Sequence, residues 1–255
     1  MDVAVALPVG VAVGLVLGLL GAGGSLLTVP ALIFLLGLST SQATGTSLVA
    51  VALMATAGVA VHGPAGRCSC REGATFGAAA AVVAVGAGAI ASVLPDRVLS
   101  GAFVVLLVGT AIWMVRGNDE ALADRGGGRA GVVAIGGAGA GVGALTGLLG
   151  VGGGFLIVPA LVGLRGMPMP LAVGTSQLVV LISAVAGLVG RLTGDSVQWG
   201  LGLLFGIGGV VGATAGSKLG GRVPADRLRL GFATVAVLVA LTMAWQVVAG
   251  GHVAG

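Results

Sequence analysis

Long stretches without any charged side chain dominate this 255-residue chain. No Asp, Glu, Lys or Arg occurs in residues 3–66, 73–95, 98–115, 130–164, 166–190, 196–217 or 230–255. A helix that crosses the hydrocarbon core of a bilayer needs about 20 mostly apolar residues, so most of these stretches hold one crossing, and the first holds several. Because the apolar runs are continuous rather than alternating with polar residues, they predict membrane-spanning helices and not strands.

The composition excludes most classes of soluble protein. Charged residues make up 8% of the chain, against roughly 25% in ordinary soluble domains. So few charges cannot cover the surface of a soluble fold, which excludes a cytosolic enzyme, a disordered tail and a nucleic-acid-binding protein. Cys68 and Cys70 are poorly spaced for a mutual disulfide and have no companions for a metal site. We expect the lipid bilayer as a partner, and neither a metal nor another cofactor.

The chain contains two copies of one pattern. A shift of 129 positions aligns residues 18–58 with 147–187 without a gap, and 21 of the 41 pairs are identical. The motif Gly-Leu-Leu-Gly-x-Gly-Gly, followed by Val-Pro-Ala-Leu and then Gly-Thr-Ser, occurs in both copies. We therefore divide the chain into a first membrane repeat, 1–116, a polar cytoplasmic linker, 117–129, and a second membrane repeat, 130–255.

Each repeat is predicted to hold a broken apolar block followed by three helices. In the first repeat the block is 3–37, broken at 21–25, and the helices lie at about 43–62, 73–94 and 98–115. In the second repeat the block is 130–164, broken at 150–154, and the helices lie at about 171–190, 196–217 and 228–249. The piece after each break has about a dozen residues, so at 1.5 Å per residue it reaches only part of the way across the bilayer core.

The basic residues decide how often each broken block crosses, since Lys and Arg gather in cytoplasmic loops. A single crossing divides the 12 basic residues six to six, which gives no orientation. A block that goes in and returns places ten on one side and only Arg97 and Arg191 on the other. The sequence thus predicts an all-α polytopic membrane protein of two inverted repeats with about five membrane segments each, one of them broken or re-entrant. Both termini are then on the outer side of the inner membrane.

The two breaks are predicted to converge on one anion site near the middle of the membrane. A helix that begins inside the membrane presents free backbone N–H groups and the positive end of its dipole, which suit an anion. Ser25 is the expected N-cap of the first short helix, and the next helix of each repeat brings hydroxyls nearby. The predicted binding residues are Gly23, Gly24, Ser25, Thr46, Ser47, Gly152, Gly153, Gly154, Thr175, Ser176 and Gln177. Small residues also pack membrane helices closely, and both interpretations stand at this point.

His62 and Arg191 occupy equivalent positions in the two repeats. Basic side chains at helix ends usually extend to the membrane surface, so we expect both residues at the interface, with guidance of an anion as the alternative. No Lys or Arg is predicted deep inside a span, so the backbone is the expected source of positive potential.

On its paired motif, the chain resembles the sulfite exporter TauE/SafE family, also called the 4-toluene sulfonate uptake permease family. The resemblance covers nearly the whole chain and implies a bacterial or archaeal inner-membrane permease for sulfite, sulfonates or related small sulfur-containing anions. Ser25 stands where the second copy has Gly154, and Leu48 stands where it has Gln177. We expect alternating access, in which the two repeats rock around the bound anion.

Two other functional classes remain open from the sequence. One is a channel or carrier for another small solute, such as an amino acid or an organic acid. A cation substrate is disfavoured, because cation sites normally bring carboxylates into the membrane and none is found inside these helices. The other class is an enzyme or a non-transporting membrane subunit. No catalytic set of residues lies in a span, so we do not expect an enzyme.

Overall fold

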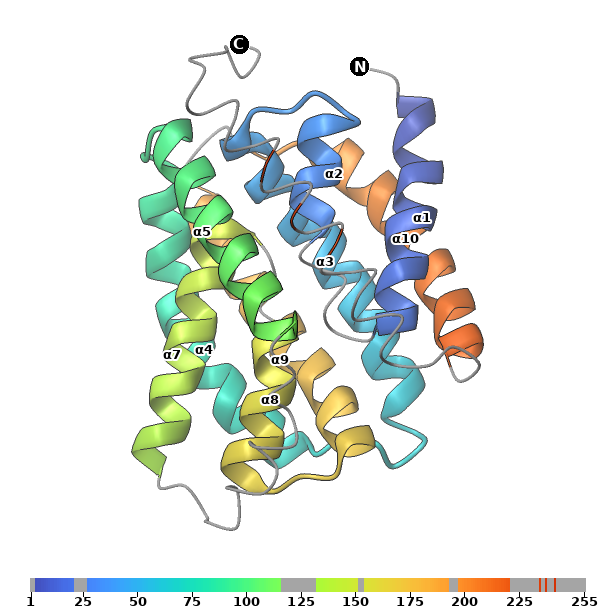
Figure 1. Ribbon diagram of the computed structural model, residues 1–255, viewed down its shortest axis with the longest axis vertical. Helices are drawn as coiled ribbons and strands as arrows, with labels where there is room; N and C mark the ends of the chain where they lie inside the picture. The colour runs from blue at the N-terminus through green and yellow to red at the C-terminus, as the bar shows by residue number, and fades with distance from the viewer. Residues whose placement is uncertain are drawn as a thin grey trace.

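The computed structural model describes residues 3–20, 27–115, 132–150, 154–192 and 197–220, and the single residues 234, 237 and 241. These parts form α-helices joined by turns, with no strand among them, which confirms the predicted all-α class. The helices are α1 (Val3–Leu20), α2 (Thr28–Phe34), α3 (Thr40–His62), α4 (Cys70–Ala91), α5 (Asp96–Val115), α7 (Val132–Leu149), α8 (Gly154–Arg165), α9 (Met169–Arg191) and α10 (Trp199–Gly220) (Figure 1).

Four of the described helices are long and apolar enough to cross a membrane. Their spans are Thr40–His62, Cys70–Ala91, Leu171–Arg191 and Trp199–Gly216. Two shorter apolar helices cover Val5–Val16 and Ile135–Leu149. The described helices that follow each broken block begin and end within three residues of the predicted limits. The predicted last helix, 228–249, lies almost entirely outside the described residues.

Large apolar side chains cover the outer surface of α4 and α5. Val82 of α4 is 78% exposed and Val105 of α5 is 73% exposed. An extended apolar surface of this kind is typical of contact with lipid rather than with water. The interior of the bundle is filled by buried Leu, Val, Ile and Phe side chains, while glycine and alanine at particular contacts let helices approach closely.

Glycines allow α1 and α10 to run side by side in the same direction. Gly10 of α1 lies against the backbone of Phe205, and Gly14 lies against the backbone of Gly209. A Cβ atom at either position of α1 would collide with the facing carbonyl of α10. The residue numbers on both helices rise together along this contact, so the two helices are parallel.

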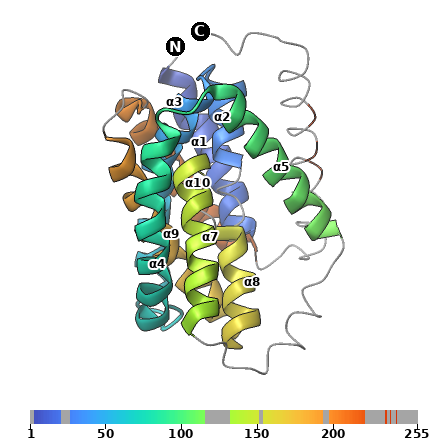
Figure 2. The same ribbon diagram turned by 90° about the vertical axis from the view of Figure 1, so that its left-hand side faces the viewer.

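The same contact occurs between α7 and α4. Gly139 and Gly143 of α7 lie against the backbone of Phe76 and Ala80 in α4. Each of these four residues stands 129 positions from its counterpart in the contact between α1 and α10. Between these two pairs, α3 and α9 contact each other, and each also contacts a helix of the other half of the chain, α10 or α4 (Figures 1 and 2).

Both short helices end at a glycine in the left-handed conformation. Gly37 after α2 has φ +67°, and Gly166 after α8 has φ +61°. The amide of Gly37 donates to the carbonyl of Ile33, and the amide of Gly166 donates to the carbonyl of Val162. Glycine is favoured at such helix ends because it adopts this backbone conformation without steric cost. These two ends are again 129 residues apart.

The first short helix begins later than the sequence predicts. α2 starts at Thr28 with Leu27 as its N-cap, and no side chain caps it. The expected start directly after Ser25 is therefore wrong, and Ser25 itself lies outside the described residues. Pro30 fits within the first turn of α2, where its missing N–H removes no helical hydrogen bond.

The second broken block enters the bundle and returns. Arg191 donates hydrogen bonds both to the last turn of α7 and to Ser41 near the start of α3. The last residue of α8, Arg165, instead pairs with Glu72 near the start of α4. Since α3 and α4 begin at opposite ends of the bundle, α8 runs back toward the end from which α7 came (Figure 2).

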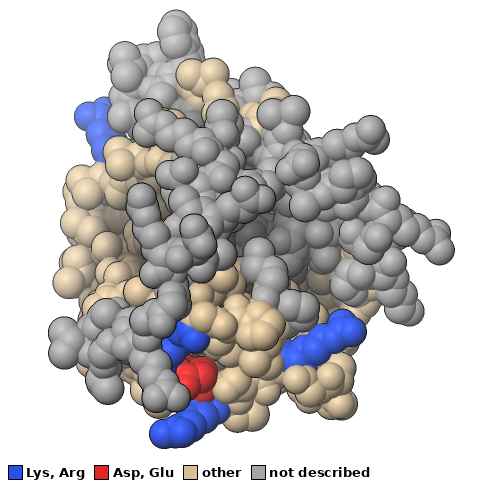
Figure 3. Space-filling model, turned by 60° about the horizontal axis from the view of Figure 1, so that its bottom comes forward, with Lys and Arg blue, Asp and Glu red and all other residues tan. Residues whose placement is uncertain are grey.

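The described arginines separate between the two ends of the bundle. Arg67, Arg71 and Arg165 lie at the end where α4 begins, and Figure 3 shows basic side chains gathered there beside an acidic one. Arg97 lies at the opposite end, where α5 begins beside the start of α3. We call these the Arg67 end and the Arg97 end. This division matches the grouping on which the predicted topology rests.

Candidate functional site

The second break lies directly against α3. Gly150 follows α7 with φ +67°, and its carbonyl accepts a hydrogen bond of 2.9 Å from the Ser47 hydroxyl. The same hydroxyl lies 2.8 Å from the carbonyl of Thr44 in its own helix. A Cβ atom at Gly150 would collide with both Thr44 and Ser47. Ser47, one of the predicted binding residues, is thus fully buried at the break in the other half of the chain.

The threonines of the two Gly-Thr-Ser motifs join the halves of the chain. The Thr46 hydroxyl in α3 accepts a 3.0 Å hydrogen bond from the backbone N–H of Gln198, just before α10. The Thr175 hydroxyl in α9 accepts a 2.9 Å hydrogen bond from the backbone N–H of Ser69, just before α4. Donors and acceptors are again 129 positions apart, with one contact near each end of the bundle. Each hydroxyl satisfies an N–H group beside a helix start and keeps its own proton to donate.

The other two described polar candidates lie in α9. Ser176 is fully buried, and its hydroxyl donates to the carbonyl of Val173 at 2.7 Å. Gln177 is 7% exposed and its side chain packs against Gly58 of α3. Within the described part of the chain, the Gln177 amide has no hydrogen-bond partner. Because an amide can both donate and accept hydrogen bonds, Gln177 has the most unused bonding capacity of the described candidates.

Most of the glycine runs at the two breaks lie outside the described residues. The candidates there are Gly23, Gly24, Ser25, Gly152 and Gly153. Gly154 is the first residue of α8, a helix of 12 residues. Its first turn carries backbone N–H groups with no partner inside the helix. That both breaks present such groups to one ligand stays a prediction.

Arg191 is buried, whereas the sequence led us to expect it at the membrane surface. Its exposed fraction is 0%. The guanidinium donates to the carbonyls of Ser41, at 3.2 Å, and Leu148, at 2.9 Å. The last turn of a helix carries partial negative charge, so the end of α7 replaces water as the partner of this cation. One signal in the sequence was available: Arg191 is the single charged residue between positions 166 and 194.

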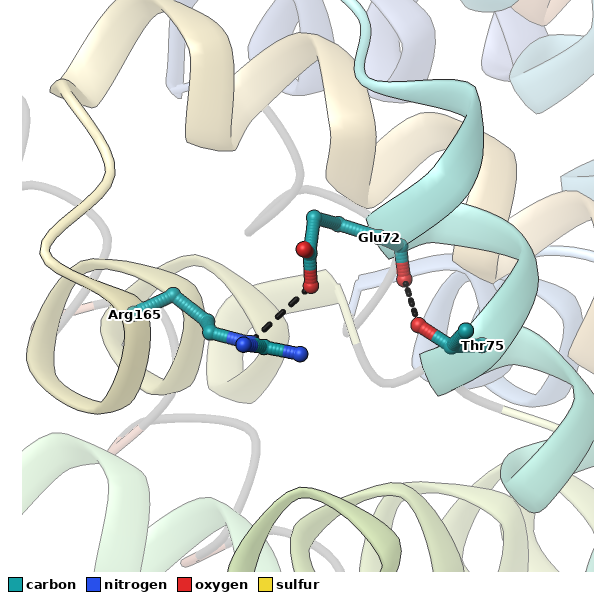
Figure 4. Close-up of polar contacts among 3 residues, drawn as sticks. All are labelled: Glu72, Thr75 and Arg165. Atoms are coloured by element: carbon teal, nitrogen blue, oxygen red, sulfur yellow. Dashed lines mark hydrogen bonds and ion pairs between the residues drawn. The ribbon is translucent and has the colours of Figure 1, made fainter. Parts of the chain in front are cut away.

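An ion pair joins α8 to α4 at the Arg67 end. The Nε of Arg165 lies 3.0 Å from a carboxylate oxygen of Glu72, and the two side chains are 29% and 24% exposed (Figure 4). The Thr75 hydroxyl donates to the backbone carbonyl of Glu72 at 3.0 Å. Partly exposed ion pairs stabilise a protein by little. This contact between the halves of the chain can therefore break and re-form at small cost.

Two buried hydroxyls that the sequence analysis did not single out have no partner among the described residues. They belong to Thr28 in α2 and Thr146 in α7, and both residues are 0% exposed. Their counterparts 129 positions away are Ile157 and Leu17. A polar residue in one copy opposite an apolar residue in the other is the signal that could have found them. An unpaired buried hydroxyl costs roughly 1–3 kcal/mol, so both are candidate ligand contacts.

Two free thiols lie at the start of α4. Burial raises the pKa of the Cys68 thiol, and the neighbouring Cys70 raises it further. Cys68 therefore stays protonated to a higher pH than an ordinary thiol, which makes it less reactive at neutral pH because the thiolate is the nucleophile. In the described part of the chain, no group of three His, Cys, Asp or Glu residues could hold a metal ion.

The fold and these contacts define an all-helical membrane protein whose two halves interlock through α3 and α9, with the short helices α2 and α8 packed against them. The sequence pattern of the sulfite exporter TauE/SafE family matches residues 6–243, so the chain belongs to this family of membrane transporters.

Two proteins of Xylella fastidiosa are similar over most of their length. The chain is 32% identical over 241 residues to a "probable membrane transporter protein" of strain Temecula1, covering 92% of each chain. It is 31% identical over 244 residues to a protein of the same description from strain 9a5c, again covering 92% of each. No solved structure matches the chain.

Proposed function

We propose that the chain is a secondary transporter, a permease that moves sulfite, a sulfonate or a related small sulfur-containing anion across the inner membrane by alternating access. The family supplies the transporter class, and its description names sulfite. The two Xylella relatives are described only as probable membrane transporters. The choice of an anion therefore rests on the charges of the helices.

The membrane helices favour an anion over a cation. The described spans within α3, α9 and α10 contain no Asp or Glu, and the Glu72 of α4 lies in its first turn. Arg191, in contrast, is buried inside the bundle. Cation sites in membranes normally use carboxylates, which are missing from these spans. An oxyanion suits the available groups, because its oxygens accept hydrogen bonds from N–H and O–H donors.

Alternating access follows from an architecture of two inverted repeats of about five membrane segments each, 1–116 and 130–255, joined by the linker 117–129. The observation that carries this proposal is the reciprocal packing: α1 on α10 matches α7 on α4 through residues 129 positions apart. The direction of equivalent helices also supports it, since α3 begins at the Arg97 end and α9 ends there. Inverted repeats with interrupted helices are the architecture of many secondary transporters.

The proposed substrate site lies between α3 and α9, beside the two breaks. Its candidate residues are Gly23, Gly24, Ser25, Thr46, Ser47, Gly152, Gly153, Gly154, Thr175, Ser176 and Gln177. Ser47 contacts the carbonyl of Gly150 at one break, and Gln177 is buried with bonding capacity to spare. When the two repeats rock against each other, a site at this position opens to one side of the membrane at a time.

Flux measurements in proteoliposomes test the proposal. Wild-type protein is expected to carry radiolabelled sulfite or methanesulfonate saturably, with mutual competition between substrate anions. Ser47→Ala and Ser176→Ala each remove a buried hydroxyl, and we expect each to lower flux about tenfold, the effect of one lost hydrogen bond. Thr56→Ala is the matched control, because the Thr56 hydroxyl is exposed and bonds within its own helix.

The outcomes separate the parts of the proposal. Uptake of an amino acid or a carboxylate, without competition from sulfite or sulfonates, would assign the chain to a different class of carrier. Normal anion flux in the double variant Ser47→Ala/Ser176→Ala would remove the site between α3 and α9 while leaving the anion transporter in place. Each variant is compared by size-exclusion chromatography so that misfolding is not mistaken for lost transport.

A further inference from the structure

Arg191 carries a positive charge in the interior of the bundle and forms no ion pair with a described carboxylate; Asp96 bonds instead to the N–H of Ser41, whose carbonyl accepts from Arg191. The side chain is 0% exposed. The ion pair found in the described part of the chain is between Arg165 and Glu72, so it does not neutralise Arg191. Burying an uncompensated cation is costly. An apolar residue at this position would avoid that free-energy cost. The presence of an arginine here therefore suggests that its charge has a function.

The three hydrogen bonds of Arg191 hold the guanidinium in place but leave its Nε–H without a partner among the described residues. Nη1 donates to Ser41 at 3.2 Å, and Nη2 faces the carbonyls of Leu148, at 2.9 Å, and Gly147, at 3.5 Å. The Nε–H is buried and has no partner in the described part of the chain. All three acceptors are neutral carbonyls, so they orient the fork without neutralising its charge. The buried Nε–H is therefore a donor that none of these three carbonyls satisfies.

The position of this cation matches the proposed path of the substrate. It lies at the last turn of α7, just before the break at Gly150, and that break contacts Ser47 of α3. It also lies at the Arg97 end of α9, the helix that carries Ser176 and Gln177. The equivalent residue in the first half, His62, is partly exposed, and its Nδ1 contacts the carbonyl of Gly58. An arginine, which is always protonated, thus stands at only one of the two equivalent positions.

We propose that Arg191 is a substrate-binding residue, whose charge and free Nε–H bind the transported oxyanion beside the second break. This inference rests on the proposed function and adds to it the residue that supplies positive charge to the site. The guanidinium stays attached to the end of α7 through its Nη groups, while Nε–H donates to an oxygen of the anion. A charge-assisted hydrogen bond of this kind is stronger than one from a neutral hydroxyl.

Substitutions of Arg191 test this role against a purely structural one. Arg191→Gln keeps a hydrogen-bonding side chain but removes the charge, and Arg191→Lys keeps the charge but removes the fork. The matched control is Arg97→Gln, which removes one exposed positive charge from the same end of the bundle. The probes are sulfite and methanesulfonate, measured by the concentration dependence of flux in proteoliposomes and by the anion-induced rise in unfolding temperature of the purified protein.

We expect Arg191→Gln to raise the half-saturating anion concentration by about 10- to 100-fold and to abolish the anion-induced rise in unfolding temperature, the size expected for a lost charge-assisted bond. Arg191→Lys should keep part of the binding, and Arg97→Gln should match the wild type. A structural role alone would lower the unfolding temperature of Arg191→Gln but leave the half-saturating concentration unchanged, which would overturn the inference.

The two levels of the proposal fail in different ways. If Arg191→Gln does not fold, the test uses Arg191→Lys. A half-saturating anion concentration equal to that of the wild type in this variant would count against binding of the anion by the guanidinium. If the wild type transports the anion and both Arg191 variants bind it normally, the role of Arg191 is wrong and the permease stands. If the wild type neither transports nor is stabilised by any oxyanion, the proposed function itself is wrong.

Discussion

At the scale of single residues, a close contact between the halves of the chain depends on one glycine. Gly150 has φ +67°, and its backbone touches Thr44 and Ser47 of α3. Gly150→Ala places a Cβ atom in a backbone region that L-residues avoid and pushes it into α3. We expect the free energy of unfolding to fall by about 2 kcal/mol or more. Unfolding in detergent micelles, followed by temperature or by added SDS, measures this change.

Gly86 of α4 provides the control for that substitution. No atom lies within 4 Å of the position that a Cβ would take at Gly86. Gly86→Ala is therefore expected to be neutral or to stabilise the helix by up to about 1 kcal/mol, because alanine has the higher helix propensity. Equal losses of stability in both variants would show that Gly150 is not under the constraint inferred here.

The paired threonines give a second prediction at the residue scale. Thr46→Val and Thr175→Val keep the shape of the side chain but leave the backbone N–H of Gln198 or Ser69 without its acceptor. Each variant should lose about 1–2 kcal/mol of stability. The contacts lie near opposite ends of the bundle, so the double variant should lose the sum. Thr56→Val should change the free energy of unfolding little, since this hydroxyl is exposed. If Thr46→Val or Thr175→Val is as stable as Thr56→Val, the prediction is wrong.

How far the site could be predicted depended on the kind of residue. Duplication singled out Ser47 and Thr46, because two copies that keep the same hydroxyls beside the same break suggest a shared requirement. Arg191 was expected at the surface, since a basic residue at a helix end usually finds water. The sequence does not reveal that the end of α7 offers carbonyl oxygens there instead. Such a partner depends on which helices meet, and that is a property of the packed bundle.

At the scale of elements, the apolar runs predicted most helices within three residues of their observed limits. Their length is fixed by the bilayer and their ends by polar turns, so hydropathy alone is informative. The start of α2 could not be predicted in this way. Several glycines precede it, and any of them or Ser25 could begin a helix on local chemistry alone. The observed start at Thr28 is decided by packing, since all residues from Thr28 to Ile33 are buried.

The ion pair between α8 and α4 carries the prediction at this scale. A double-mutant cycle with Glu72→Gln and Arg165→Gln should give a coupling energy of about 0.5 kcal/mol, because both side chains are partly exposed. The coupling should fall in high salt, since solvent ions screen exposed charges. Unfolding in detergent at low and high salt measures it. A coupling of several kcal/mol, unchanged by salt, would instead indicate a pair shielded from water.

At the scale of the whole molecule, the two halves of the chain are interlocked rather than side by side. α1 packs on α10 and α7 packs on α4, so the first helix of each half rests on the other half. The alignment of the two copies predicted the duplication but not this exchange, because an apolar helix face fits a neighbour from either half equally well. Close glycine contacts, as at Gly10 and Gly139, select the observed partners by excluding larger side chains. Neither half is therefore expected to be stable alone.

The orientation in the membrane gives the last prediction. The chain has two cysteines, Cys68 and Cys70, both at the Arg67 end. The positive-inside rule predicts that this end faces the cytoplasm, so we expect a membrane-impermeant maleimide to label inside-out vesicles but not intact spheroplasts. Cys68 should react more slowly than an ordinary thiol at neutral pH and faster as the pH rises, because its pKa is raised and only the thiolate attacks.

In a variant with both cysteines changed to serine, Arg97→Cys should show the opposite pattern of labelling, in intact spheroplasts but not in inside-out vesicles. Labelling of both positions from one side would mean that α4 does not cross the membrane, and exchanged patterns would mean that the protein is inserted the other way round.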